Sequence, residues 1–308
     1  MLDTEKSGDA TANERRKVFF GLFVFPMLIA VTMAVLLSAI VLLTKEDEKP
    51  ESLVTAIKTG APSKRWQKAF ELSNELNSED GLIRSAGVMK EVIHILNDKD
   101  HYDGKTRAYM AMALARFQNP EARDALLEAL RGTDDTEDPE VPLFIMWALG
   151  DVASRTPRSE VTDSLEVSNE VARFLESEHD DLRKGAAYIL GVLDDESAAV
   201  DLKNVLDDPV ADVRWNAALS LARLGDGSGL ETLVEMLERE RLTRVYGLGR
   251  EEIERVMVNA AKGLGLVLQK GTVPEKGDSP LLLLLTEVSK SDPSLKVRQA
   301  ALAALEGY

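Results

Sequence analysis

The chain has 308 residues and no cysteine, and its 37 basic and 53 acidic residues give a net charge of −16 at pH 7. The lack of thiols excludes disulfides, thiolate metal sites and cysteine nucleophiles, and so acidic a surface repels nucleic acid and anionic lipid headgroups. Residues 1–44 hold four residues of each charge, so the whole excess of negative charge lies after them. We therefore expect a protein partner that is basic or neutral, or one that is embedded in the membrane, and no nucleic acid.

The N-terminal region predicts a membrane anchor. Residues 1–17 are polar, without apolar periodicity, and we expect them to be disordered. Residues 18–44 contain no charged side chain, and these about 27 residues exceed the ~20 that cross a bilayer core as a helix. Because a helix satisfies its own backbone polar groups, lipid tolerates it. We predict a transmembrane helix over 18–44, a linker over 45–50 and a large domain over 51–308.

The charges that flank this segment predict its orientation. Arg15, Arg16 and Lys17 precede it directly, whereas Lys45 and Lys49 are spread among acidic residues after it. Clustered positive charge marks the cytoplasmic side. The prediction is a single-pass protein with a cytoplasmic N-terminus and a periplasmic or otherwise extracytoplasmic domain. A cleaved signal peptide, whose apolar core spans about 7–15 residues, and a twin-arginine export signal remain alternatives.

Internal repeats dominate the remaining sequence. Residues 181–193 and 212–224 align at a constant offset of 31 residues, and both contain an Ala-Ala pair followed by Leu three positions later. Related segments occur near 107–117, 147–150, 261–265 and 297–305, and shorter amphipathic pieces lie between them at 121–130, 198–206 and 230–237. Abundant Ala and Leu, with only 5% aromatic residues, favours helices over strands.

Each repeat reads as a short helix, a turn and a longer helix with small residues at fixed positions. Small residues let helices cross closely, and Leu at helical spacing fills the seam. One such hairpin cannot bury its apolar face alone, so the units must stack into a solenoid. We count about seven hairpins, with loops near 154–165, 240–249 and 270–279. Their second helices are expected near 63–76, 104–117, 139–153, 180–193, 211–224, 250–269 and 294–306.

The repeat pattern resembles a known family. A D-x-R start followed by A-A-x-x-L-[GA]-x-L, as in residues 181–193 and 212–224, is similar to the short HEAT repeats of phycobilin lyases. The resemblance implies an all-α fold, a right-handed α-α superhelix whose second helices line the concave face. It specifies function poorly. A protein-interaction scaffold, a bilin-lyase-like enzyme or chromophore-handling protein, and a structural subunit of a membrane complex all remain open.

The repeat carboxylates and arginines favour a structural role. Asp181 and Asp212 stand where a helix N-cap is expected, and Arg183 and Arg214 are placed to bridge to carboxylates of a neighbouring unit.

No catalytic or metal-binding pattern stands out. Gly263-Leu264-Gly265 falls inside a repeat helix and serves packing, and residues 134–138 are acidic but lack the order of a calcium loop. We predict no enzymatic activity, no catalytic residue, no cofactor and no metal site. A loose polar cluster lacks zinc-site spacing and is expected to be a solvated loop; it comprises His94, Asp98, Asp100, His101 and Asp103.

An apolar stripe supplies the candidate binding surface. In the repeat frame, the first, second, fifth and ninth residues after the arginine position point away from the core, by the 100° helical step. Apolar side chains on an exposed face mark binding surfaces. The alternative is that a neighbouring helix or loop covers them. The predicted partner-binding residues are Tyr109, Met112, Phe144, Trp147, Tyr188, Trp215 and Leu219.

Overall fold

The computed structural model describes residues 20–44, 49–77, 85–117, 119–133, 138–155, 164–270 and 280–307. The chain divides into two compact units, Met1–Lys49 and Pro50–Tyr308. The predicted disordered tail over 1–17 and most of the predicted linker lie outside the described residues.

The first unit is a single apolar helix. A π-helical turn at Phe20–Val24 leads into α2, Phe25–Thr44. Pro26 follows the π-helical turn within this continuous helical stretch and has no backbone N–H to donate to it. The Thr32 hydroxyl donates to the Leu28 carbonyl at 2.7 Å. Residues Leu22–Ala39 have a mean hydropathy of 2.4, so this helix is long and apolar enough to cross a membrane. A signal sequence near an N-terminus can be as long and as apolar.

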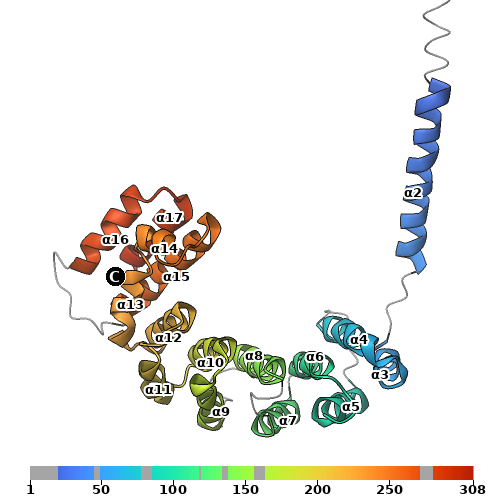
Figure 1. The fold of residues 1–308 in the computed structure, drawn as a ribbon, viewed down its shortest axis with the longest axis horizontal. Coiled ribbons are helices and arrows are strands. Elements are labelled where there is room, and N and C mark those ends of the chain that lie inside the picture. Colours follow the sequence, from blue (N-terminus) through green and yellow to red (C-terminus); the bar gives the residue numbers. More distant parts are fainter. Residues whose placement is uncertain are drawn as a thin grey trace, which may run out of the picture. The chain divides into compact units, whose positions relative to one another are not determined.

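Helices are the only regular secondary structure in the described residues of the second unit, and its α-helices alternate in two rows (Figure 1). The second helices of the hairpins lie on the inside of the curve that this unit follows. They are α4 (Pro62–Glu75), α6 (Gly104–Leu114), α8 (Glu140–Arg155), α10 (Asp180–Leu193), α12 (Ala211–Leu224), α15 (Arg250–Gln269) and α17 (Leu295–Glu306). The first helices are α3 (Pro50–Thr59), α5 (Ala86–Asn97), α7 (Pro120–Arg131), α9 (Ser164–Ala172), α11 (Ala199–Asn204), α13 (Leu230–Glu235) and α16 (Pro280–Ser291).

The predicted all-α repeat architecture is confirmed. Every expected second helix is present, with bounds within a few residues of those read from the repeat frame. One expected loop is wrong: residues 240–249 contain α14, Arg239–Arg244. This helix is a polar insertion between α13 and α15, and only Leu242 in it is buried, so it gives no apolar periodicity. Residues 156–163 and 271–279 of the other two expected loops lie outside the described residues.

The 31-residue repeat extends into the turns. Asp195 and Asp226 each accept a hydrogen bond from the backbone N–H two residues later, at 3.0 and 2.8 Å. The residue before each aspartate has a positive φ, 57° at Asp194 and 83° at Gly225. A left-handed residue of this kind ends a helix and reverses the chain, so both units turn in the same way.

Small residues allow the second helices to approach closely. The Ser220 hydroxyl on α12 donates to the Ala187 carbonyl on α10 at 2.7 Å. A Cβ added at Gly191 would lie 2.8 Å from the Ser220 Cα, and one added at Gly229 would lie 2.7 Å from the Ala218 Cα. Larger side chains at these positions would force neighbouring backbones apart, which explains the fixed small positions in the repeat.

The repeat arginines tie each unit to its own turn and to the next unit. Arg183 donates to the Ser177 carbonyl at 2.8 Å and to the Asp208 carboxylate at 2.7 Å. Arg214 likewise donates to the Asp208 carbonyl at 2.7 Å, and its guanidinium lies 3.7 Å from Glu235. The predicted bridging by arginine is therefore confirmed.

The predicted capping role of the repeat aspartates is wrong. The N-cap residues of α10 and α12 are His179 and Val210, and neither makes a side-chain cap. Asp181 lies inside the first turn, where its carboxylate is 2.6 Å from the Lys184 amine. A first-turn carboxylate still interacts favourably with the helix dipole, which accounts for its place in the repeat.

An Asp-Pro motif supplies the groups that accept hydrogen bonds from the repeat arginines. The Asp208 side chain is nearly buried and accepts from Arg183, while its carbonyl accepts from Arg214. Asp292 repeats this arrangement, since its carboxylate accepts from Arg239 at 2.8 and 3.0 Å and its carbonyl from Arg298 at 2.6 Å. The shared pattern D-P-x-x-x-V-R begins at both positions and is the signal that sequence analysis missed.

The charge state of Asp208 makes this link dependent on pH. Burial alone raises its pKa, but hydrogen bonds from Arg183 and the Val210 N–H outweigh burial and hold the pKa below its usual range. Because the folded pKa lies below that of the unfolded chain, the stabilisation is complete above about pH 4 and is lost as the pH falls through the folded pKa.

We expect Asp208→Asn to lower the free energy of unfolding by about 1.5–3 kcal/mol at pH 7, the value of a hydrogen bond to a charged group. Denaturant unfolding of the full chain, followed by helical circular dichroism, measures this. Asp207→Asn is the matched control, since Asp207 is exposed and should change stability by about 0.5 kcal/mol or less. The gap between the two variants should narrow below pH ~4; an equal loss in both would contradict the assignment.

Candidate binding groove

The structure divides the seven predicted partner-binding residues into three groups. Trp147 and Tyr188 are exposed, with 51% and 42% of their surface accessible. The half-buried group comprises Tyr109, Met112, Phe144 and Leu219. Trp215 is buried, with 5% of its surface accessible.

The expectation that Trp215 lies on the exposed face is wrong. Its ring meets the Tyr246 ring edge-to-face at 5.2 Å, within the C-terminal part of the core. Tyr246 follows α14, the helix that sequence analysis read as a loop, and its hydroxyl accepts from Arg214 at 2.9 Å. This inserted segment covers the face at α12 that the repeat frame leaves open elsewhere.

A row of touching aromatic rings crosses the inner helices α4, α6 and α8. Tyr109 contacts Phe70, Trp66 and Phe144, with ring centroids 5.3, 6.5 and 5.7 Å apart, and Phe144 stacks on Trp147 at 6.4 Å. We call these five residues the aromatic row. Phe70, 45% exposed, and Trp66 were missed from the sequence, although the expected helix over 63–76 contains both and offered the signal.

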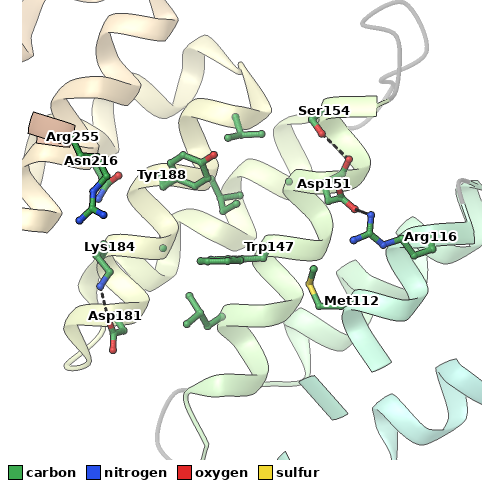
Figure 2. A pocket seen from close by; sticks show the side chains of 15 residues that line it. Met112, Arg116, Trp147, Asp151, Ser154, Asp181, Lys184, Tyr188, Asn216 and Arg255 are labelled. Carbon is green, nitrogen blue, oxygen red and sulfur yellow. Dashed lines mark hydrogen bonds and ion pairs between the residues drawn. The ribbon is translucent and has the colours of Figure 1, made fainter. Parts of the chain in front are cut away.

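A groove of about 930 Å³ continues from this row across α8, α10 and α12 (Figure 2). Trp147 and Tyr188 lie in its centre, with Met112 and Arg116 on one side and Lys184, Asn216 and Arg255 on the other. We call this space the groove. Its lining joins apolar and charged side chains from five successive inner helices, α6 to α15.

Two glycines shape the floor of the groove. A Cβ added at Gly185 would lie 2.5 Å from Leu143, and one added at Gly150 would lie 2.6 Å from Ile189. Leu143 therefore packs onto the backbone of α10, and Ile189 onto the backbone of α8. The floor is shallow and apolar there, with the two exposed rings beside it.

Charged side chains surround these rings. Arg116 lies 3.2 Å from Asp151, which also accepts a hydrogen bond from Arg155 at 3.1 Å. Burial lowers the pKa of Arg116, and its Nε has no hydrogen-bond partner among the described residues. The hydrogen bond to Asp181 raises the pKa of Lys184.

A further cation lies over Tyr188. The Arg223 guanidinium carbon is 5.2 Å from the ring centroid, a cation–π distance. Lys105 is similarly placed over Trp66, with its amine 3.7 Å from the ring centroid. The aromatic surface of the inner helices is thus bordered by positive charge at both ends.

The polar cluster around His101 is a folded turn. His101 Nδ1 lies 2.9 Å from Asp98, and this hydrogen bond lowers the pKa of the Asp98 carboxyl. Asp103 caps α6 by accepting from the Thr106 N–H at 2.9 Å. In the part of the chain that the structure describes, no three His, Asp or Glu side chains are arranged to hold a metal ion.

Comparison with known proteins identifies the repeat. The sequence profile of HEAT repeats matches residues 89–173 and 169–248, together just over half of the chain. The chain belongs to the HEAT-repeat family, and its repeat unit is an α-solenoid of the kind that binds protein partners. No curated protein sequence matches it.

Solved structures share this architecture at low identity. The complex of CpcE and CpcF of phycocyanin lyase from Nostoc sp. PCC7120 is 16% identical, with a TM-score of 0.50, over 84% of this chain and 94% of that chain. A designed armadillo repeat protein in complex with the peptide (KR)4 is 17% identical, with a TM-score of 0.45, over 84% and 99%. An engineered protein is 19% identical, with a TM-score of 0.46, over 84% and 67%. Similarity at this level concerns the fold alone.

Stability measurements test which of the predicted partner-binding residues are exposed and which are buried. We expect Trp215→Ala to cost about 3–5 kcal/mol, as for a buried aromatic residue. Trp147→Ala and Tyr188→Ala should each cost about 1 kcal/mol or less, because half of each side chain already faces solvent. Denaturant unfolding of the full chain measures all three. Equal losses for Trp147→Ala and Trp215→Ala would show that Trp147 is covered in solution.

Proposed function

We propose that this protein is a membrane-tethered scaffold or adaptor whose groove receives a segment of a protein partner. The observation that carries the proposal is the exposure of Trp147 and Tyr188 beside an apolar floor. Exposed aromatic rings in a concave site are typical anchors of protein interfaces. The proposal assigns a binding role to these two residues and also to Tyr109, Met112, Phe144 and Leu219. Trp215 acts from the core by supporting α12.

The proposal assigns the anchor to residues 18–44 and the interaction module to residues 51–308. The N-terminus is cytoplasmic in this arrangement and the repeat domain extracytoplasmic, because the basic cluster precedes the span. Tethering raises the effective concentration of the module for a partner in the same membrane. The net charge of −16 favours long-range encounter with a basic or neutral partner surface. No catalytic role is assigned.

Site-specific photocrosslinking in intact membranes tests the groove. A photoreactive amino acid at position 188 should form discrete adducts with a partner, and Trp147→Ala in the same chain should suppress them, since loss of an anchor weakens affinity about thirtyfold. Position 200 is the matched control, because Val200 is 67% exposed on the outer helix α11. Adducts that are equal at both positions, or unaffected by Trp147→Ala, would contradict the proposal.

Protease accessibility tests the topology. Protease added outside spheroplasts should digest the chain beyond about residue 45 and leave a membrane-bound N-terminal fragment. An inner-membrane protein with a known cytoplasmic domain serves as the control for intact spheroplasts. Protection of the repeat domain until lysis would place it in the cytoplasm.

A further inference from the structure

We propose that the segment bound in the groove is acidic, an extended stretch of a partner protein whose carboxylates alternate with apolar anchors. This inference rests on the proposed function and adds the chemistry of the partner. It differs from what net charge predicts, because the lining of the groove holds three cations against two carboxylates in an otherwise acidic protein.

The charged side chains that line the groove favour carboxylates. Arg116, Lys184 and Arg255 line it, against Asp151 and Asp181. Both aspartates are already engaged, Asp151 between Arg116 and Arg155, and Asp181 by Lys184 at 2.6 Å. An incoming basic side chain would therefore have to displace an existing ion pair.

Arg255 and Arg223, which have no ion-pair partner among the described residues, border the same space. Among the described residues no carboxylate lies within ion-pair distance of Arg255, which is exposed. Arg223 lies over Tyr188, and its Nη1 is buried without a hydrogen-bond partner in the described part of the chain. Arg116 Nε is in the same state. Buried donors left unpaired are costly, but these two nitrogens are enclosed by protein. The exposed guanidinium of Arg255 is the group that a ligand carboxylate would reach.

Asp180 and Asp212, counted with the lining carboxylates, offset the three lining cations, so the preference for a carboxylate rests on the unpaired cations and not on the summed charge. Asp180 and Asp212 act on Lys184 at longer range than Asp181 does.

Arg255 lies toward the α15 end of the groove and Arg116 toward the α6 end. Arg223 belongs to α12 and lies over Tyr188. The aromatic rings between these cations can receive apolar side chains of the bound segment. Along the groove, the order is therefore a cation, an aromatic surface and a second cation.

The reach of the groove sets the length of the segment. Its lining comes from five successive inner helices, α6 to α15, and neighbouring helix axes are about 8–10 Å apart. Four such spacings are covered by an extended segment of about ten to twelve residues.

The test uses the full chain in nanodiscs of phosphatidylcholine and three labelled synthetic peptides of about eleven residues. All share Leu and Phe at alternate positions, and the remaining positions are Glu, Gln or Lys. Fluorescence anisotropy should show the Glu peptide binding at least about tenfold more tightly than the Lys peptide, with affinity falling as salt screens the charges. Arg255→Glu should weaken binding of the Glu peptide about fivefold or more.

Arg250→Glu is the matched control, because it makes the same change in net charge at an exposed position of the same helix, outside the groove lining. It should leave binding of the Glu peptide nearly unchanged; an equal effect of both variants would overturn the inference. Tighter binding of the Lys peptide that Trp147→Ala abolishes would also overturn it, while leaving the groove as a binding site. Binding of all three peptides that Trp147→Ala does not affect would remove both the inference and the proposed function.

Discussion

A two-helix hairpin cannot cover its own apolar face, and the whole repeat unit of this protein follows from that constraint. Each second helix packs on the second helix of the next hairpin, at crossings narrow enough to require Ala, Gly or Ser. The arginine links lie at the same junctions, so charged and apolar contacts together join neighbouring units. Stacking therefore fixes which positions of each second helix are small, which are buried and which remain open.

The groove is a consequence of this stacking. Positions that face neither the hairpin partner nor the next unit lie on the inner face, and the chain places Trp147 and Tyr188 there in consecutive units. At α12 the same face is closed by the segment around Tyr246, whose ring packs on Trp215. The open surface thus ends where an inserted helix begins, which confines the binding surface to α4–α12 and the near side of α15.

The repeat frame was sufficient to predict the second helices. Ala and Leu at this strict spacing fall on one face of a helix, and only one arrangement of that helix buries the face. It was not sufficient for α14, whose six residues carry four charged side chains and owe their helical state to tertiary packing. The error over Trp215 follows directly, since its exposure depends on a ring 31 positions away that the frame did not contain. The aromatic row was extended by Trp66 and Phe70 for a similar reason: contacts between units decide which side chains form one surface. The arginine bridges were predictable in kind, and the pattern D-P-x-x-x-V-R that begins at Asp208 and Asp292 could have indicated their partners.

Net charge and local charge act at different distances, which reconciles an acidic chain with a groove that receives an acidic segment. The field of the whole protein is screened beyond about 8–10 Å at physiological salt, so it influences approach more than docking. Within the groove, Arg116, Lys184 and Arg255 line the space that a bound segment would occupy, and Arg223 lies over the Tyr188 ring, so these cations influence which sequence binds. An acidic surround also disfavours a uniformly acidic partner, and thereby restricts binding to partners that present acidic residues only in the docked segment. The combination selects for a partner with a short acidic, apolar-anchored stretch on an otherwise neutral or basic surface.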